Sequence, residues 1–365
     1  MRIWIDGYEA NAQQRLGSSQ VAFELLSNLE KIDLKNDYTV LLPAPPLSDL
    51  PREREGWKYK MLKPKKLWTR IALPLALFTA KQKPDIFFSP THYIPRFIPR
   101  TVKKIVTIFD LSFLHFPEMF TKGDLWKLIN WTRFSVQNAD HIITISNFSK
   151  QDIMKQYKIN KNKITVAYPG YDREKFTGDR RQVTDKKYII YIGTIQPRKN
   201  LLRLIEAVSR IDNLNLMVVG KTTGEGKQGW MYEEILRAPS DFGIEDRVKF
   251  LGFVPTEELQ TLLAGAIAYV QPSLWEGFGI PVVEAMAVGT PVIVSNVSSL
   301  PEVVGKAGLL IDPYSVDQIE QAIRLIVTDK RLQQKYSKAG LLQSQKFSWD
   351  KMAKEVLKVF EKLGS

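Results

Sequence analysis

The chain has 365 residues, of which 44% are hydrophobic and 25% charged, and this composition excludes a disordered chain and a collagen-like repeat. It contains no cysteine, which excludes disulfides, a thiol nucleophile and cysteine-ligated metals. The net charge is +13, and residues 51–104 supply +11 of it through 14 basic and 3 acidic residues. The excess charge therefore belongs to one segment and needs a local explanation.

Short apolar runs alternate with amphipathic stretches of helical length along most of the chain. Continuous apolar strands separated by helices indicate parallel sheets that are covered on both faces. The expected strands are residues 2–6, 38–42, 85–89, 104–109 and 141–145, followed by residues 188–193, 216–220, 248–252, 266–271 and 291–295.

The pattern begins again near residue 188, where a strand once more leads into a polar loop and then a helix. Residues 167–187 are polar and rich in turn formers, so we interpret them as the connection between two domains. The fold class is therefore α/β, with two doubly wound Rossmann-like domains facing a central cleft at the carboxyl ends of their sheets, where ligands bind in such folds. The expected domains are residues 1–168, 169–346 and a C-terminal helix, 347–365, that packs back on the first domain.

Two features bear on the compartment of the protein. Asp6 interrupts the N-terminal apolar stretch too early for a signal peptide. The longest apolar segment, residues 71–80, has half the length needed to span a bilayer and contains Pro74. We therefore expect a cytoplasmic protein.

The most informative segment is QPSLWEGFGIPVVEAMAVGTPVI, residues 271–293, in which a strand ends, a glycine-rich loop follows and a helix begins near Pro281. Gly277 and Gly279 let the backbone approach a ligand, and free amides at the start of a helix favour an anion. Glu276 and Glu284 bracket this loop, and a carboxylate accepts hydrogen bonds from vicinal sugar hydroxyls. A tight turn with two solvated glutamates is the alternative.

The loop GTIQPRKN, residues 193–200, favours the functional interpretation. Arg198 and Lys199 lie just before a helix, where cations are unfavourable unless an anion is present. The planar guanidinium and the point charge together suit a diphosphate. A solvated pair of cations is the alternative here.

With these motifs in place, the sequence resembles the retaining GT-B nucleotide-sugar glycosyltransferases of family four, also called glycosyl transferases group 1. The likeness covers essentially the whole chain, and the wording of PRKN and EGFGIPVVE is similar to that of bacterial mannosyltransferases of polysaccharide assembly. It is carried by YIGTIQPRKNLLRLIEA, the stretch from FLGFVP to SLPEVVG, VTIFDLSFLHFPEMF and ADHIITISNFSKQDI.

The resemblance implies roles for single residues. Arg198 and Lys199 would hold the donor diphosphate, Glu284 the ribose and Glu276 the donor sugar, and Asp110 would lie near the reacting sugar. Catalytic roles would thus fall on Glu276, Lys199, Arg198 and Asp110. The remaining donor-binding residues would be Gly17, Thr194, Phe253, Val254, Gly277, Phe278, Gly279 and Ile280.

The chain departs from the family pattern at two positions. Many members carry His directly before the Asp, where this chain has Phe109, and some carry Arg where it has Thr194. We therefore assign no catalytic histidine, and the donor-sugar contacts of the first domain stay open.

The resemblance also implies a mechanism. The cations and helix amides would stabilise the departing diphosphate, an oxocarbenium-like centre would be attacked from the leaving-group face, and no protein base, cofactor or metal would be needed. Three scattered histidines do not make a metal site. Of these, His92 follows a strand and is the first candidate for acceptor contact, and His115 and Trp126 are further candidates.

The basic segment mixes Trp57, Tyr59, Trp68 and Phe78 with Lys and Arg. This pattern suits peripheral contact with an anionic membrane, with the aromatics and Leu75 or Leu77 entering the lipid boundary at the inner face of the cell membrane. A solvated loop followed by a core helix is the alternative. Nucleic acid is the weakest interpretation, because the expected diphosphate site already gives the chain another ligand.

Three functions follow from these patterns. The first is a glycosyltransferase that builds a surface glycan on a glycan or lipid-linked acceptor, with GDP-mannose preferred by resemblance and a UDP-sugar or other nucleotide-sugar donor as the alternative. The second is a GT-B nucleotide-sugar epimerase, which would convert the donor without an acceptor. The third is a basic nucleic-acid-binding protein.

Overall fold

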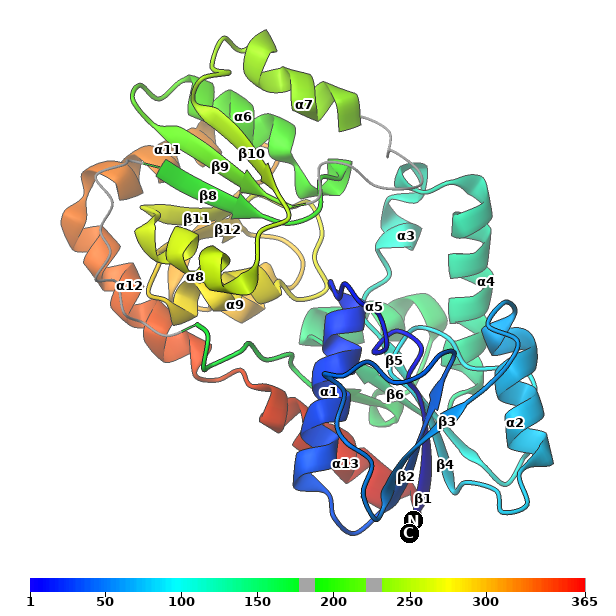
Figure 1. The fold of residues 1–365 in the computed structure, drawn as a ribbon. Helices are drawn as coiled ribbons and strands as arrows, with labels where there is room; N and C mark the ends of the chain where they lie inside the picture. The colour runs from blue at the N-terminus through cyan, green and yellow to red at the C-terminus, as the bar shows by residue number, and fades with distance from the viewer. Residues whose placement is uncertain (177–187, 221–231, 365) are drawn as a thin grey trace. The chain divides into compact units, whose positions relative to one another are not determined.

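The structure is a computed structural model, and it describes residues 1–176, 188–220 and 232–364 (Figure 1). Residues 177–187 of the expected connection lie outside the described residues. The chain divides into two compact units. The first comprises Met1–Leu114, Lys122–Pro169 and Trp349–Ser365, and the second comprises His115–Thr121 and Gly170–Ser348.

The first unit is built on a parallel sheet of seven strands. Its helices are α1 (Ser18–Ile32), the π-helical turn η1 (Trp68–Ala72), α2 (Leu73–Thr79), α3 (Ser112–His115), α4 (Lys122–Asn138), α5 (Asn147–Tyr157), the 3-10 turn η3 (Lys161–Lys163) and α13 (Trp349–Gly364). In spatial order the strands are β3 (Trp57–Met61), β2 (Asp37–Leu42), β1 (Arg2–Asp6), β4 (Ile86–Ser89), β5 (Lys103–Ile108), β6 (His141–Thr144) and β7 (Ile164–Val166).

The second unit repeats this design on a parallel sheet of six strands. Its helices are the 3-10 turns η2 (Pro117–Met119) and η4 (Pro197–Lys199), then α6 (Leu201–Ser209), α7 (Tyr232–Asp241), α8 (Thr256–Gly265), α9 (Ile280–Ala287), α10 (Leu300–Val304), α11 (Val316–Thr328) and α12 (Lys330–Ser344). In spatial order the strands are β10 (Val248–Gly252), β9 (Asn215–Val219), β8 (Tyr188–Ile192), β11 (Ala268–Gln271), β12 (Val292–Ser295) and β13 (Gly308–Ile311).

Both units are doubly wound, and the order of their strands reverses at one place in each sheet. Neighbouring strands at that place are β1 and β4 in the first sheet and β8 and β11 in the second. In open α/β sheets the crevice for a ligand opens at the carboxyl ends of such strands. The α/β fold class with two Rossmann-like units is therefore confirmed.

All ten strands predicted from apolar runs are present, because strands such as β4 and β11 are buried along their whole length. Three further strands were missed. The strand β3 (WKYKM) is an edge strand whose lysines face solvent, so it lacks a continuous apolar run. The strands β7 and β13 are short edge strands of three and four residues.

The last helix, α13, packs against α1 in the first unit (Figure 1). One face of this helix is apolar, and its residues Trp349, Met352, Val356 and Phe360 are all buried. The ring of Phe360 lies 5.4 Å from that of Phe88 on β4. Residues that lie 272 positions apart in the sequence, Phe88 and Phe360, therefore share one core.

The basic segment is only partly a surface loop, and one detail of the membrane interpretation is wrong. Trp57, Trp68 and Leu77 are 0%, 7% and 0% exposed, so these side chains belong to the core and cannot enter lipid. Leu75 and Phe78, at 55% and 53%, are exposed. Within the described ranges, no helix is both long and apolar enough to cross a bilayer.

We expect Phe360→Ala to destabilise the first unit by about 3–5 kcal/mol, because it removes a buried ring and leaves a cavity between α13 and β4. Urea unfolding monitored by circular dichroism measures the effect. The exposed Lys358→Ala on the same helix is the control and should change stability by less than about 0.5 kcal/mol. Equal effects of the two substitutions would show that α13 is not part of that core.

Candidate functional site

The candidate site lies in the second unit, where its strand order reverses. Two loops leave the carboxyl ends of the neighbouring strands β8 and β11, namely residues 193–200 and residues 272–279. The sequence motifs PRKN and EGFG are these two loops. Motifs that lie 77 residues apart in the chain thus meet at one edge of the sheet.

The first loop has a conformation that requires particular residues. Gly220, which follows β9, passes so close that a Cβ atom there would lie 2.0 Å from the carbonyl oxygen of Gly193. The loop then forms the turn η4 and ends at Asn200, which has a positive φ of 62° and precedes α6. Asn tolerates this left-handed region better than most residues. The buried Asn200 amide donates to the carbonyl oxygens of Pro272 and Pro313 and ties the loop to its neighbours.

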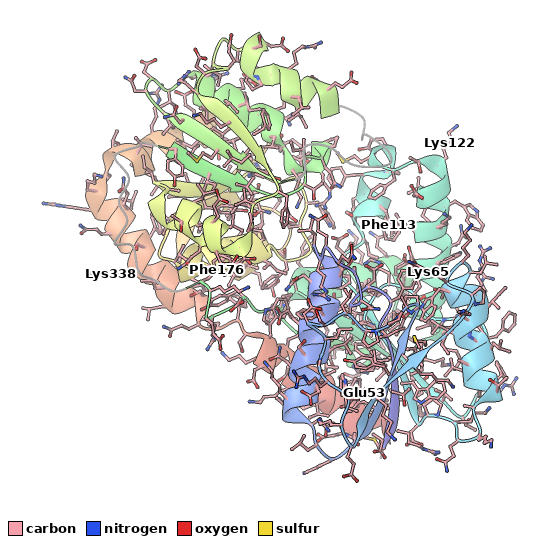
Figure 2. All side chains as sticks on the ribbon, viewed as in Figure 1. Glu53, Lys65, Phe113, Lys122, Phe176 and Lys338 are labelled. Atoms are coloured by element: carbon pink, nitrogen blue, oxygen red, sulfur yellow. The ribbon has the colours of Figure 1, made fainter. Side chains whose placement is uncertain are left out.

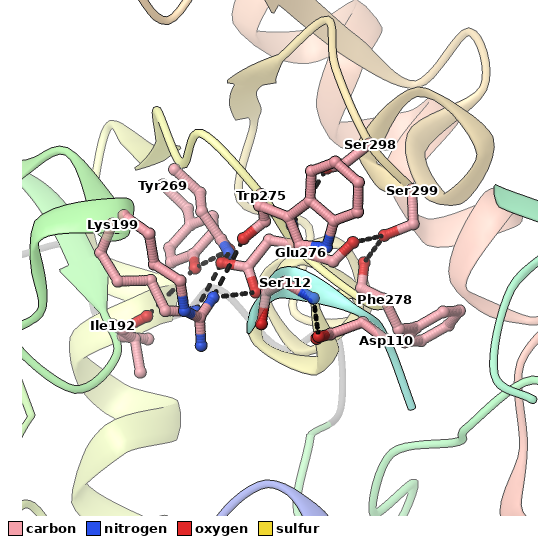
Figure 3. Close-up of polar contacts among 12 residues, drawn as sticks. Asp110, Ser112, Ile192, Lys199, Tyr269, Trp275, Glu276, Phe278, Ser298 and Ser299 are labelled. Atoms are coloured by element: carbon pink, nitrogen blue, oxygen red, sulfur yellow. Dashed lines mark hydrogen bonds and ion pairs between the residues drawn. The ribbon is translucent and has the colours of Figure 1, made fainter. Parts of the chain in front are cut away.

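The second loop is fixed mainly through its backbone. Gly279, with a φ of 103°, provides the turn into α9, and Ser298 and Ser299 hold the preceding residues. The amide of Glu276 donates to Ser298 Oγ at 3.1 Å, and Ser299 Oγ donates to the carbonyl oxygens of Glu276 and Phe278 (Figure 3). The loop is therefore held in place by a segment that follows β12.

A buried cluster of opposite charges joins the two loops (Figure 3). Lys199 Nζ lies 2.5 Å from Glu276 Oε1, and Arg198 Nη1 lies 3.6 Å from Glu276 Oε2. The Glu276 side chain is only 8% exposed, and Gln271 Nε2 also donates to it. Burial raises the pKa of Glu276, but the charges of Lys199 and Arg198 outweigh burial and hold it at about 2. Glu276 is therefore ionised at every working pH.

This cluster explains how Arg198 and Lys199 can lie just before a helix, where cations are unfavourable. Two cations before a helix require an anion, and in this structure Glu276 supplies it. Arg198 is held further by its hydrogen bond to the carbonyl oxygen of Trp275, at 3.0 Å. The two cations are thus fixed in position at the end of the sheet where ligands bind.

Glu284, on α9, has the opposite environment from Glu276. Burial, with a smaller contribution from the charge of Asp172, raises its pKa to about 7. The two glutamates of the motif therefore have very different pKa values, although they are only eight positions apart in the sequence. One remains ionised, and the other titrates near neutral pH.

The other predicted residues of the second unit lie around these loops in different ways. Thr194 and Phe253 are exposed, and Val254 is buried. The Phe278 side chain is 2% exposed and packs on Phe347 at 5.3 Å, so it belongs to the core of this unit. His115 belongs to this unit, where its ring stacks on Trp275 at 4.1 Å.

The remaining candidates belong to the first unit. Gly17 begins α1 with a φ of 57°, and Asp110 accepts a hydrogen bond from the Ser112 amide at 2.8 Å. His92 stacks on Phe109 and accepts a hydrogen bond from its amide, and burial lowers the pKa of His92. Trp126 is 56% exposed on α4.

Sequence reasoning missed four residues that position the site, namely Gln271, Asn200, Ser298 and Ser299. Asn200 and Gln271 each had a signal, since one ends the PRKN motif and the other is a polar residue that ends an apolar strand. Ser298 and Ser299 follow β12, and no sequence pattern pointed to them. In the part of the chain that the structure describes, no group of three or more His, Asp and Glu residues is placed to hold a metal ion.

Comparison with known proteins identifies the family. Residues 172–343 match the family model described as glycosyl transferases group 1, and residues 17–175 match that of glycosyltransferase family 4. The O-antigen chain mannosyltransferase B of Escherichia coli is 31% identical over 77% of this chain and 75% of the relative. The chain belongs to the group 1 glycosyltransferases.

A further relative agrees with this assignment, and solved structures show the same fold. The O-antigen chain mannosyltransferase RfbU of Salmonella typhimurium is 30% identical over 63% of this glycosyltransferase and 62% of its own length. Sucrose-phosphate synthase from Thermosynechococcus elongatus has a TM-score of 0.82 at 20% identity, with 99% of this chain and 98% of that chain covered. The glycosyltransferase WaaG has a TM-score of 0.70 at 16% identity and covers 98% of this chain and 99% of its own. The fold is therefore GT-B.

We expect Glu284→Gln to stabilise the protein at high pH but not at low pH. Because the pKa of Glu284 is raised to about 7, the stability linked to its protonated form is present below its ordinary pKa and is lost as the pH rises through about 7. A glutamine keeps the neutral form. The gain should be about 1–3 kcal/mol near about pH 8 and close to zero near about pH 4.

Thermal unfolding at both pH values measures this difference. The matched control is Glu245→Gln, at an exposed position of the same unit. A stabilisation by Glu284→Gln that does not change with pH would contradict the raised pKa.

Proposed function

We propose that this glycosyltransferase moves a sugar from a nucleotide-sugar donor to a glycan or lipid-linked acceptor in cell-surface polysaccharide synthesis, and that the donor is GDP-mannose. The names of its relatives support the sugar, since two of them are O-antigen chain mannosyltransferases. The buried cluster of Lys199, Arg198 and Glu276 at the reversal point of the second sheet carries the proposal.

The donor contacts are those that the resemblance to the family implies. Lys199 and Arg198 bind the diphosphate, and the ionised Glu276 accepts hydrogen bonds from sugar hydroxyls. Glu284, one turn into α9, accepts those of the ribose. The remaining donor contacts are Gly17, Thr194, Phe253, Val254 and the residues 277–280, and Asp110 lies near the reacting sugar.

The reaction proceeds with retention of configuration. The bond between the anomeric carbon and the phosphate oxygen breaks, and negative charge develops on the leaving diphosphate. Lys199, Arg198 and the amides at the start of α9 stabilise this charge more in the transition state than in the ground state. The acceptor oxygen attacks from the same face, and its proton passes to the leaving phosphate oxygen. These fixed cations supply the charge that a metal ion would otherwise provide.

We expect Lys199→Ala to weaken the binding of GDP and GDP-mannose by at least about tenfold and to lower turnover by about 10²–10³-fold, because the variant lacks the cation that we propose binds the diphosphate. Thermal shift measures binding, since a ligand at about 100 times its Kd stabilises the native state by about 2.7 kcal/mol. The exposed Lys338→Ala in the same unit, labelled in Figure 2, is the control.

Other outcomes discriminate between the alternatives. Stabilisation by UDP-sugars but not by GDP-mannose would replace the donor and keep the enzyme class. Conversion of the donor to its epimer without an acceptor, followed by NMR, would indicate an epimerase. A product of inverted anomeric configuration would contradict the retaining mechanism, and no stabilisation by any nucleoside diphosphate would refute the donor site.

We also propose peripheral contact with an anionic membrane through residues 51–104, at the inner face of the cell membrane, with no role for nucleic acid. The charge of +11 supports it, as do Ile71, Leu75 and Phe78, which are 44%, 55% and 53% exposed. Their spacing places them on one face along η1 and α2. An apolar stripe beside exposed lysines suits the boundary of an anionic bilayer.

We expect the protein to sediment with phosphatidylglycerol vesicles, not with phosphatidylcholine vesicles, and to be released by high salt. The double variant Leu75→Ser/Phe78→Ser should lower vesicle binding by about tenfold or more, because apolar burial is lost. Leu342→Ser, at a 68% exposed position of the second unit, is the control. Equal binding to both kinds of vesicle, or equal effects of both variants, would remove the membrane contact.

A further inference from the structure

A buried amide, the side chain of Gln271, lies beside the charged cluster of the second unit. Gln271 is the last residue of β11, at the reversal point of the sheet, and it is 2% exposed. The strand is otherwise composed of Ala268, Tyr269 and Val270. A buried amide costs free energy unless it is hydrogen-bonded, so a polar residue at this position needs partners for its nitrogen and for its oxygen.

Gln271 has one such partner on each side of its amide. Its Nε2 atom donates to Glu276 Oε1 at 2.5 Å, and its Oε1 atom accepts a hydrogen bond from the Tyr269 hydroxyl at 2.5 Å. Tyr269 and Gln271 are two positions apart on β11, so their side chains lie on the same face of the sheet. The three residues form one chain of hydrogen bonds, and Figure 3 shows its two ends, Tyr269 and Glu276.

The two neighbours determine which way the Gln271 amide faces. Glu276 is ionised, so its oxygens can only accept hydrogen bonds, and the group that faces them must be the NH₂ group of the amide. The amide oxygen then faces Tyr269. Burial raises the pKa of Tyr269 well above its ordinary value, so this hydroxyl keeps its proton and can donate it. The reversed amide would place two acceptor oxygens at the contact with Glu276, so only one orientation satisfies both neighbours.

The oriented amide restricts which oxygen of Glu276 can accept a hydrogen bond from a ligand. Glu276 Oε1 accepts from Gln271 Nε2 and from Lys199 Nζ, each at 2.5 Å. Each oxygen of a carboxylate has about two lone pairs for hydrogen bonds, so these two protein donors use the capacity of Oε1. A hydroxyl group of a ligand is therefore accepted by Oε2, which lies 3.6 Å from Arg198 Nη1.

Gln271 differs from the two cations in what it can interact with. Lys199 and Arg198 are charged, so a bound diphosphate would share them with Glu276. The Gln271 amide is neutral and buried, and it has no comparable attraction to an anion. Its hydrogen bond to Glu276 is therefore the one that a diphosphate leaves in place.

We propose that Gln271 is a positioning residue of the donor site: with its amide oriented by Tyr269, it directs Glu276 Oε2 toward a hydroxyl group of the donor sugar. Gln271 acts through Glu276 and does not itself contact the ligand. This inference rests on the proposed function, in which Glu276 accepts hydrogen bonds from the sugar. It requires that changes at Gln271 affect recognition of the sugar and not of the diphosphate.

The first test compares a nucleotide-sugar with its own nucleoside diphosphate in calorimetric titrations. Gln271→Met keeps the length of the side chain and removes both hydrogen bonds. It should weaken GDP-mannose by at least about tenfold and GDP by less than about threefold, because only the former carries the sugar. UDP-glucose and UDP are titrated in the same way. Equal losses for a sugar and its diphosphate, or no loss for either, would overturn the proposal. Gln334→Met, at an exposed position on α12, is the control.

The second test asks whether Tyr269 acts through Gln271. Tyr269→Phe removes the hydroxyl that orients the amide, and it should weaken the nucleotide-sugar by about threefold or more. In the Gln271→Met background it should cause no further loss, because the amide that it orients is gone. Losses that multiply in the double variant would overturn the proposal. Tyr188→Phe removes a comparable hydrogen bond, to the carbonyl oxygen of Leu262 at 2.7 Å, and is the control that should leave binding unchanged.

The third test uses a variant whose effect depends on pH. Gln271→Glu has nearly the same shape, and its carboxyl group donates a hydrogen bond to Glu276 only while it is protonated. Burial and the charge of Glu276 raise the pKa of the introduced group. Other charged and titratable groups in this network come from η4, β8, β11 and α9. They are Arg198, Lys199, Tyr191, Tyr269 and Glu284. Glu284 titrates near neutral pH, so the variant is always compared with wild type at the same pH.

We expect Gln271→Glu to bind the nucleotide-sugar within about threefold of wild type near about pH 5.5 and at least about tenfold more weakly near about pH 8.5, since the donor becomes a second negative charge. Gln271→Met should be weak at both pH values. A loss in Gln271→Glu that equals that of Gln271→Met at every pH would overturn the proposal, because it would show that shape rather than hydrogen bonding at this position matters.

The same variant tests the hydrogen bond without any ligand. Because the pKa of the introduced carboxyl group is raised, the stability linked to its protonated form is present below its ordinary pKa and is lost as the pH rises through the raised value. The melting temperature of Gln271→Glu relative to wild type should therefore fall between about pH 5.5 and about pH 8.5. Gln334→Glu, on the exposed face of α12, is the control. A difference from wild type that does not change with pH would overturn the contact with Glu276.

The failure of this proposal differs from that of the proposed function. If wild type binds a nucleotide-sugar and Gln271→Met binds it equally well, the positioning role is wrong and the donor site stands. If wild type binds neither the nucleotide-sugars nor their diphosphates, the donor site is wrong. The unfolding of the ligand-free Gln271→Glu variant then decides by itself whether Gln271 holds Glu276.

Discussion

The burial of the Glu276 carboxylate constrains the conformation of the second unit. A charge removed from water costs several kcal/mol unless it is paired and hydrogen-bonded. Lys199, Arg198 and Gln271 supply these partners, and they come from two different loops. Neither loop can move away without leaving a charge unpaired, so the cations are in place before any ligand arrives.

The two glutamates of one motif have different pKa values because their local environments differ. Glu276 lies between cations and has a pKa of about 2, and Glu284 is desolvated and has a pKa of about 7. The first is a fixed negative charge, and the second is the group whose ionisation weakens the fold near neutral pH. A site that keeps such a group gives up stability that a glutamine would restore, which is a common cost of function.

The sequence predicted the parts of this molecule that repeat a simple pattern. Buried central strands are continuous apolar runs, so all ten expected strands are found, whereas the edge strands β3, β7 and β13 mix polar residues or are too short. The two charged motifs could be recognised in the sequence, but the ion pair between them could not. Lys199 and Glu276 come together only because β8 and β11, the strands that precede their loops, are neighbours in the folded sheet. The same limit applies to Trp57 and Trp68, whose burial depends on tertiary contacts rather than on their basic neighbours.

The return of α13 to the first unit has a consequence for biosynthesis. The strands of the first unit leave the ribosome before the second unit does, but the helix that completes their core is made only after it. The first unit therefore cannot complete its core until the whole second unit has been synthesised. During that time the face of α1 that α13 covers stays exposed. Contacts of such long sequence separation form slowly, so chaperone dependence during translation should fall on the N-terminal unit.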